Sequence, residues 1–370
     1  MKRSKVFFTS MRCKIGVSIL SKLESLMDLA KFSSINFKKK FTAVKMHLGE
    51  PGNLSFLRPN FAKTVVDKIK GLGGRPFLTD CGTLYVGRRN DALSHLEAAW
   101  ENGFGPLSAG CPILIADGLR GNDDYEVTVE NGELVKTALI GRAIMDADIV
   151  ISLSHFKGHE QTGFGGAIKN LGMGSGSKAG KMIMHNDGKP TVEADVCQSC
   201  GQCRLNCAHE AIKFKNRKAF INIDKCAGCG RCIGACNYNA ISVAWDSAND
   251  SLNKKMAEYA KAVVQNRPNF HINVVNQVSP FCDCHFENDA AVVPDIGIFL
   301  GFDPVAVDAA SIDAVNKAST LAGTIVDEIK DPGGDLFTKI HPTTDWRSQL
   351  EHAEKIGLGL RAYELITMES

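Results

Sequence analysis

Two stretches, CQSCGQCRLNC at residues 197–207 and CAGCGRCIGAC at residues 226–236, decide how this chain is understood. Both follow the spacing C-x2-C-x2-C-x3-C, so the second repeats the first. The match extends beyond the cysteines, because Ala211–Ile212 corresponds to Ala240–Ile241. Each half ends in a short apolar run that predicts a strand, and the whole segment is therefore an internal duplication.

Four cysteines in one such run are typical of bacterial 4Fe–4S ligation. The first three thiolates of a run surround one cubane, and the fourth reaches the cluster of the other run. This crossing predicts two clusters, with the ligand sets Cys197, Cys200, Cys203 and Cys236, and Cys226, Cys229, Cys232 and Cys207. Two four-cysteine zinc sites are the alternative, but these normally use separated C-x2-C pairs. Ala208 and Asn237 replace the usual Pro of the motif, which leaves the ligand count unchanged.

The rest of the composition is that of an ordinary globular protein. The 370 residues include 44% hydrophobic and 23% charged residues, with a formal net charge of +2. These values exclude a disordered chain and a strongly basic nucleic-acid binder. Eight of the 13 cysteines cluster in the duplication and no secretory signal is recognised, so we expect reduced thiols in a cytoplasmic protein. No stretch approaches the roughly 18 apolar residues of a membrane helix, so we expect no membrane contact.

The duplicated segment carries a local positive charge. Between Asp195 and Trp245, seven Lys and Arg stand against three Asp and Glu, which gives the apoprotein segment a charge of +4. Each oxidised cubane with four thiolates carries about −2, so two clusters would neutralise the segment. The basic residues therefore either compensate the clusters or form a docking surface for an acidic electron carrier of the ferredoxin or flavodoxin type.

Both flanks of the duplication predict an α/β body with a largely parallel sheet covered on both faces. Apolar or alternating runs predict strands at residues 41–48, 76–80, 113–116, 148–154, 270–278 and 292–300. Helices are predicted at residues 20–32, 60–71, 137–145 and 252–265, and Asp303 with Pro304 predicts the start of another. Linker-like runs place an inserted α+β ferredoxin-like di-cluster module at residues 191–246, between body segments 1–190 and 247–370.

The strand predicted to end at Ser154 leads into an unusually glycine-rich stretch, residues 155–181. Ligands of open α/β sheets bind beyond the carboxyl ends of strands, where glycines let backbone amides approach and lysines attract an anion. We therefore predict a site for an anionic small molecule, with catalytic residues His155, His159 and Lys169 and cofactor-binding residues Gly163, Gly165, Gly166, Gly172 and Gly174. The stretch matches no standard phosphate motif, so a structural turn or a docking surface for the clusters are alternatives.

The histidines and the remaining cysteines leave further alternatives open. His155 and His159 suit acid–base chemistry or metal binding, although a loop histidine is more often solvated. The set Cys282, Asp283, Cys284 and His285 predicts either ligands for a further metal or two buried thiols.

Together, the stretch 155–181, the paired cysteine runs, Cys282 to Cys284 and the segment 293–308 resemble the uncharacterised iron–sulfur-centre proteins built on domain of unknown function 362. The resemblance covers nearly the whole chain. It implies a ferredoxin-type module that interrupts an α/β body, two 4Fe–4S clusters, and electron transfer without an established reaction. His159, Gly165–Gly166 and Lys169 more faintly resemble nickel-dependent lactate racemase, which implies that Lys169 faces a ligand.

These observations favour an iron–sulfur electron-transfer protein. We expect a ferredoxin-linked redox protein that passes electrons through two 4Fe–4S clusters to an unidentified substrate or cofactor in the α/β body. One alternative is a redox-sensing or binding module whose clusters are structural, and another is a non-redox isomerase or lyase that uses the glycine-rich stretch. The short basic run Lys38–Lys40 is more typical of a solvated face, so we expect no nucleic-acid partner.

Overall fold

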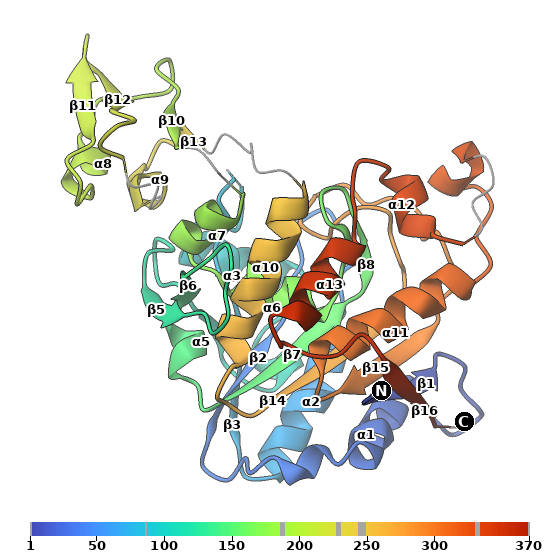
Figure 1. Cartoon of the computed structure of the whole chain (residues 1–370). Helices are drawn as coiled ribbons and strands as arrows, with labels where there is room; N and C mark the ends of the chain where they lie inside the picture. The colour runs from blue at the N-terminus through green and yellow to red at the C-terminus, as the bar shows by residue number, and fades with distance from the viewer. Residues whose placement is uncertain are drawn as a thin grey trace.

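The computed structural model describes residues 2–85, 87–185, 189–226, 231–242, 249–329 and 334–368. A large sheet forms the centre of the body and carries helices on both faces (Figure 1). Its eight strands lie in the spatial order β16 (Tyr363–Thr367), β1 (Ser4–Ser10), β15 (Gly297–Gly301), β14 (Asn269–Val275), β7 (Ile149–His155), β2 (Phe41–Lys45), β3 (Arg75–Asp80) and β4 (Ile113–Ile115).

Most of this sheet is parallel. Strands β14, β7, β2, β3 and β4 run in one direction, whereas β15 is antiparallel to both of its neighbours, β14 and β1. The edge strand β16 pairs parallel with β1. The predicted α/β class with a largely parallel sheet is confirmed.

Successive residues of the central strands serve two separate cores, because side chains alternate between the faces of a sheet. In β7, Val150 belongs to one apolar cluster and Ile151 to the other. The first cluster is covered by α6 (Ala167–Ser175), α10 (Asn249–Val264) and α11 (Pro304–Lys317). The second is covered by α1 (Ile19–Leu29) and α2 (Pro59–Gly71), which Figure 1 shows on the opposite side of the sheet.

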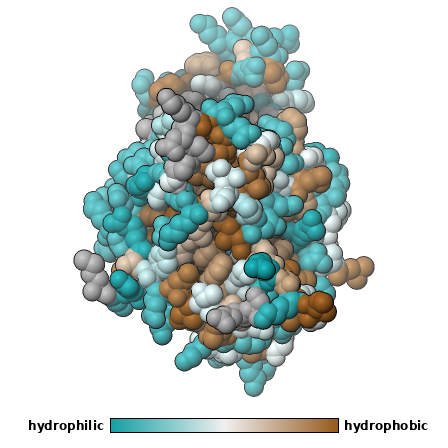
Figure 2. All heavy atoms as spheres, turned by 90° about the vertical axis from the view of Figure 1, so that its right-hand side faces the viewer, coloured by the Kyte–Doolittle hydropathy of each residue, from teal (hydrophilic) through white to brown (hydrophobic). Residues whose placement is uncertain are grey.

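Shorter elements complete the body. They are α3 (Ala92–Glu101), α4 (Pro106–Ala109), α12 (Leu336–Ile340), α13 (Arg347–Lys355) and the 3-10 helices η1 (Phe32–Ser34) and η2 (Ile325–Glu328). Figure 2 shows hydrophilic residues gathered along the sides of one face and apolar residues mainly along its middle. Of the helices in the described part of the chain, none combines the length and apolarity needed to cross a bilayer.

The helix predicted at residues 137–145 is wrong. β6 (Thr137–Gly141) pairs antiparallel with β5 (Asp124–Thr128), and the helix α5 (Arg142–Asp146) starts only afterwards. So short an apolar run is compatible with the two-residue period of a strand and with the 3.6-residue period of a helix, and pairing with β5 makes it a strand. The strand predicted at residues 292–300 likewise begins only at Gly297, and neither β1 nor β16 is among the predicted strands.

The glycine-rich stretch folds into regular elements instead of the expected loop. β8 (Lys157–His159) and β9 (Gly163–Gly165) form a hairpin, and α6 and α7 (Lys178–His185) follow. Gly163 has a φ of 78°, which a residue with a side chain rarely adopts. At Gly172 a Cβ atom would lie 2.1 Å from the carbonyl oxygen of Met256, so this glycine lets α6 pack closely on α10.

Helix α6 begins on a buried carboxylate supplied by α11. Asp308 accepts hydrogen bonds from the backbone amides of Ala167 and Ile168, at 2.7 and 2.9 Å. The side-chain amide of Asn273 in β14 donates to the same carboxylate at 2.7 Å. The carboxylate thus occupies the helix N-terminus that an anionic ligand would otherwise use.

The cysteine-rich segment forms small sheets of its own beside the body (Figure 1). Its elements are β10 (Thr191–Val192), α8 (Gln202–Leu205), β11 (Ile212–Lys215), β12 (Lys218–Ile221), α9 (Arg231–Ala235) and β13 (Ile241–Ser242). The antiparallel pairing of β10 with β13 brings the two ends of the segment together. Its apolar cluster includes Leu84 and Met182 from the body. The domain boundaries after residues 190 and 246 stay a prediction.

Replacement of the capping carboxylate tests its role in the fold. In Asp308→Asn, the new NH2 group must face one of the N–H donors that the carboxylate now accepts from. We expect a loss of about 1–3 kcal/mol in the free energy of unfolding, measured by urea denaturation. Asp313→Asn is the matched control on the same helix, since its remaining oxygen still accepts from the hydroxyl of Tyr363. Equal stability of the two variants would contradict the capping role.

Candidate functional site

A cavity of about 740 Å³ opens at the carboxyl ends of the parallel strands. Lys45, Asp80 and His155 are the last residues of β2, β3 and β7, and all three line it. The connection that follows β14 contributes Cys282 and Cys284. Ligands of open α/β sheets bind at this edge, so the fold places the candidate site where the sequence predicted one.

The floor of the cavity is a buried ion pair. The Lys45 ammonium lies 3.0 Å from the Asp80 carboxylate, and it donates to the side chain of Asn170 at 2.9 Å. Burial alone would raise the pKa of Asp80, but Lys45 and the neighbouring His95 outweigh it, so the pKa lies below its ordinary value. The floor therefore holds two charges that compensate each other.

One wall is built by Arg89. Its guanidinium lies 2.5 Å from the Glu50 carboxylate and also bonds the hydroxyl of Tyr85. The Tyr85 hydroxyl in turn donates to the carbonyl oxygen of Cys284 at 3.2 Å. The segment after β3 is thus tied to the turn that carries the two cysteines.

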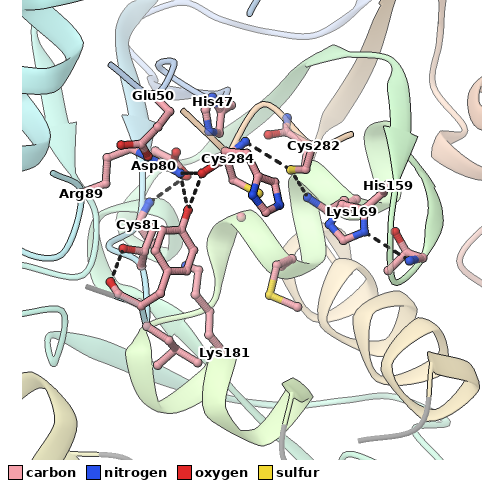
Figure 3. A pocket seen from close by; sticks show the side chains of 18 of the residues that line it. His47, Glu50, Asp80, Cys81, Arg89, His159, Lys169, Lys181, Cys282 and Cys284 are labelled. Carbon is pink, nitrogen blue, oxygen red and sulfur yellow. Dashed lines mark hydrogen bonds and ion pairs between the residues drawn. The ribbon is translucent and has the colours of Figure 1, made fainter. Parts of the chain in front are cut away.

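At the other end of the cavity, Lys169 and His159 converge on Cys282 and Cys284 (Figure 3). The Lys169 ammonium donates to the Cys282 sulfur at 3.2 Å, and the Cys284 amide donates to the same sulfur at 3.4 Å. Cys282 is buried and Cys284 is half-buried. We call these four residues the thiol cluster.

The surroundings in the thiol cluster shift the pKa values of its two cysteines in opposite directions. Hydrogen bonding from Cys284 lowers the pKa of Cys282, and Lys169 and His159 lower it further against the opposing effect of burial. The pKa of Cys284 is raised by its bond to Cys282 and by burial. Burial opposes the charge of Lys169, but the two thiols outweigh it and raise the lysine pKa. The arrangement therefore favours a Cys282 thiolate, a Cys284 thiol and a charged lysine.

His159 is held by the turn of its own hairpin. Its Nδ1 accepts hydrogen bonds from the backbone amides of Gln161 and Thr162, at 3.1 and 3.2 Å. An accepting ring nitrogen carries no hydrogen, so the ring hydrogen is on Nε2. A ring nitrogen of His159 lies within 4.8 Å of the Cys282 sulfur.

The histidine that lies beside the two cysteines is His159, not the neighbouring His285. Ligand atoms of His159, Cys282 and Cys284 lie within 4.8 Å of one another, the type of set that a soft metal ion uses. His285 instead faces Glu160, with Nε2 3.0 Å from the carboxylate. Asp283 turns away from the cavity, toward the His155 ring at 3.0 Å and Lys157 at 3.2 Å. The four residues 282–285 therefore do not form one ligand set.

Two of the three predicted catalytic residues lie together in the cavity, and the third is held by other contacts. His159 and Lys169 belong to the thiol cluster, as described above. Both ring nitrogens of His155 are engaged, Nδ1 by Asp283 and Nε2 by the carbonyl oxygen of Asn276 at 2.6 Å. Neither nitrogen is therefore free to exchange a proton with a ligand, and His155 positions the cysteine turn through Asp283.

Of the five glycines predicted to bind a cofactor, two line the cavity and three do not. Gly166 and Gly174 line the cavity, and their binding role stays a prediction. Gly163, Gly165 and Gly172 do not line it, and a Cβ atom there would meet Trp346, Lys169 and Met256 respectively. These three glycines permit close packing.

Several cavity residues were not predicted as site residues. The sequence prediction omitted Lys45, Asp80, Glu50 and Arg89, although Asp80 ends a predicted strand and could have been found from that position. Lys45 lies inside the strand predicted at residues 41–48, whereas β2 ends at this residue. His47 also lines the cavity, and its buried Nε2 makes no hydrogen bond with any residue that the structure describes. Burial lowers the pKa of His47 to about 3, so its ring is neutral.

The cavity wall is positive overall. Its basic residues are Lys45, Lys157, Lys169, Lys181, Arg88 and Arg89. Its acidic residues are Glu50, Asp80 and Glu160. Lys157 and Arg88 pair with Asp283 and Glu101 outside the lining. The excess that suits an anionic ligand therefore lies at Lys169 and Lys181, for which no carboxylate partner is found among the described residues.

The cysteine-rich segment contains two small hollows. One is lined by Cys197, Cys200, Cys203 and Cys236, and the other by Cys207, Cys226 and Cys232. Cys229, predicted as a further ligand, lies outside the described residues. The described cysteines are free thiols.

Comparisons with solved structures find distant likenesses. The lactate racemase apoprotein from Thermoanaerobacterium thermosaccharolyticum is 14% identical with a TM-score of 0.36, over 74% of this chain and 51% of that one. A protein from Thermotoga maritima is 10% identical with a TM-score of 0.36, over 91% of this chain and 58% of that one. The chain thus spans little more than half the length of these proteins, and such likenesses carry no argument about function.

Comparison with curated protein sequences finds no match. A family model described as "Domain of unknown function (DUF362)" matches residues 42–313, which include most of the sheet, the cavity and the cysteine-rich segment. Because the match extends over well more than half of the chain, the protein belongs to the DUF362 family.

Proposed function

We propose that this protein is an iron–sulfur redox protein that passes electrons from a carrier protein, through two 4Fe–4S clusters, to the cavity of the α/β body. The observation that carries the proposal is the grouping of the cysteines. Cys236 of the second run lines the hollow of the first three cysteines, and Cys207 of the first run lines the other hollow. When bound, each cluster supplies a one-electron redox centre.

The spacing of the sulfur atoms supports clusters over single zinc ions. A tetrahedral zinc site with bonds of about 2.3 Å brings its sulfur atoms to roughly 3.8 Å of one another. Within the described ranges, no three thiols of the cysteine-rich segment lie within 4.8 Å of one another. A cubane places iron and sulfide between its thiolates and so accommodates this wider spacing.

Backbone amides are aimed at the cysteine sulfur atoms in both halves of the duplication. The amides of Ala211 and Ala240, which correspond in the repeat, donate to Cys207 at 3.4 Å and to Cys236 at 3.3 Å. Such donors stabilise thiolates and tune the potential of a bound cluster. The repeated contact indicates that both halves are built for anionic sulfur.

Helix α7 connects the cysteine-rich segment to the cavity. Met182 packs into the apolar cluster of that segment, together with Cys203 and Cys232. On the same helix, Lys181 and His185 line the cavity. Leu84 belongs to both environments, since it lines the cavity and packs in the same cluster. Packed side chains therefore link the two sites, as electron transfer between them requires.

In the proposed function, the electron carrier docks on the β11–β12 hairpin. Lys213, Lys215 and Arg217 are exposed on it. By contrast, Lys218 donates to the carbonyl oxygen of Cys197 at 2.8 Å and so is part of the cluster surroundings. The exposed cations suit an acidic carrier of the ferredoxin or flavodoxin type.

Iron content tests the clusters and their crossing. Protein purified without air should contain about eight iron atoms per chain and show a broad absorption near roughly 400 nm that dithionite bleaches. Cys207→Ala with Cys232→Ala removes two ligands of one set and should leave about four iron atoms. Cys203→Ala with Cys207→Ala removes one ligand from each set and should leave almost none. Cys13→Ala, at an exposed cysteine outside both sets, is the control.

Three results would count against this proposal. Zinc in place of iron would exclude the clusters. Four iron atoms in the Cys203 and Cys207 double variant would exclude the crossing. Clusters that resist reduction at every accessible potential would favour a structural role and a sensing or binding function.

Charge reversal on the hairpin tests the docking surface. Lys213→Glu with Lys215→Glu should slow electron transfer from a reduced acidic ferredoxin by about tenfold at low salt, because opposite charges steer association. Stopped-flow bleaching of the cluster absorption measures this rate. Lys38→Glu with Lys39→Glu makes the same charge change just before β2, at the sheet end opposite the cavity, and should leave the rate unchanged. Equal slowing in both variants would contradict a specific docking site.

A further inference from the structure

The thiol cluster has no task in the proposed function, although it stands in the cavity that the electrons are proposed to reach. Cys282 and Cys284 both line that cavity, and both are free thiols. Their sulfur atoms lie within 4.8 Å of each other. Two thiols this close in one cavity are a two-electron redox couple when they can form a bond.

The chain between the two cysteines permits such a bond. The His285 amide donates to the Cys282 carbonyl oxygen at 3.1 Å and closes a tight turn over residues 282–285. A tight turn keeps residues two apart near the Cα separation of about 4.4–6.8 Å that a disulfide requires.

The surroundings of Cys282 are those of an attacking thiolate. Lys169 and the Cys284 amide donate to its sulfur, and a ring nitrogen of His159 lies within 4.8 Å of it. Among the described residues no cation makes a hydrogen bond to the Cys284 sulfur, and Arg89 reaches only the carbonyl oxygen of this residue, at 3.4 Å. The cluster thus distinguishes one sulfur as nucleophile and the other as its resolving partner.

The same contacts disfavour a metal ion at these two cysteines. A metal-bound histidine normally donates its other ring N–H to an acceptor, whereas Nδ1 of His159 itself accepts from two amides. The buried Lys169 ammonium would also lie beside the metal cation. Both features fit an anionic sulfur better than a metal–thiolate centre.

We propose that Cys282 and Cys284 form a redox-active dithiol–disulfide pair that reduces low-molecular-weight anionic disulfides in the cavity. In the oxidised pair a bond joins the two sulfur atoms, and two electrons and one proton convert it to a Cys282 thiolate and a Cys284 thiol. The electrons arrive singly from the reduced carrier protein, and in this respect the inference rests on the proposed function.

The transfer to substrate balances without a further reactant. The Cys282 thiolate attacks one substrate sulfur, breaks the substrate disulfide and releases one half as a thiolate. Cys284 then attacks the mixed disulfide, restores the bond to Cys282 and releases the second thiolate and its own proton. The volume of about 740 Å³ and the excess of basic residues in the wall suit a substrate of peptide size that carries carboxylates.

Trapping of the mixed disulfide tests this proposal. The full chain, purified without air, is incubated with oxidised glutathione as an anionic disulfide or with cystamine as a cationic one. The remaining thiols are then alkylated and the cysteine peptides are identified by mass spectrometry. In Cys284→Ser we expect a glutathione adduct on Cys282, formed at least about tenfold faster than the cystamine adduct, which corresponds to about 1.4 kcal/mol of charge preference. In the unaltered chain we expect a Cys282–Cys284 disulfide and no lasting adduct.

Two comparisons make the result specific. Cys13 is exposed and reports the intrinsic reactivity of each disulfide in the same sample. Lys169→Met keeps the length of the side chain and removes its charge, and should slow the Cys282 adduct by about tenfold. Because the unaltered chain is read directly, a variant that fails to fold does not decide the outcome.

The proposal is overturned if Cys282 stays unmodified in Cys284→Ser while Cys13 reacts, or if the unaltered chain never forms the internal disulfide. It is also overturned if a metal ion is retained in stoichiometric amount and both thiols react only after chelation. The assay needs no electron donor, so its failure is distinct from failure of the proposed function. Reducible clusters without the disulfide would refute the pair alone, and the disulfide without iron would refute the electron supply alone.

Discussion

The site depends on the hydrogen bonds that the Asp308 carboxylate accepts from the first amides of helix α6, because they fix where this helix begins. The carboxylate joins three elements through the amides of Ala167 and Ile168 in α6 and the side chain of Asn273 in β14. Lys169 and Asn170 are the next two residues of that helix, and their direction follows from its start. Lys169 therefore reaches the Cys282 sulfur, and Asn170 reaches the Lys45 ammonium at the cavity floor. One buried acid thus orients both ends of the cavity.

The buried charges of the cavity then determine its chemistry. Lys45 is compensated by Asp80, and Arg89 by Glu50, so these cations are part of the framework. The contact of Lys169 is instead with sulfur, at 3.2 Å. A buried ammonium is costly unless an anion is near, and the group within hydrogen-bond distance that can become one is the Cys282 thiol. The cost of burying Lys169 therefore favours the reactive form of Cys282, and stability and reactivity are properties of the same contact.

The sequence indicated the central strands well and the site only in part, for a physical reason. The runs that form β3 and β7 are short and largely apolar, and the start of α11 has its cap in adjacent residues, so local patterns suffice. The contacts that build the site join residues far apart in the chain. His155 meets Asp283 across 128 positions, and nothing in the neighbourhood of either residue specifies the other.

The same limit explains why the metal set predicted at residues 282–285 is not found as such. Proximity in sequence favours His285, but the tight turn that contains it directs its ring toward Glu160. His159 approaches the cysteines from the β8–β9 hairpin, which the sequence presents only as glycine-rich. A glycine of helix α7 also helps to hold the cavity next to the cysteine-rich segment. At Gly180 a Cβ atom would lie 2.3 Å from the Leu139 carbonyl oxygen, so only glycine lets α7 approach β6. Because α7 is held there, it can face the cavity with one side and the cysteine-rich segment with the other, and a larger residue at this position would separate them.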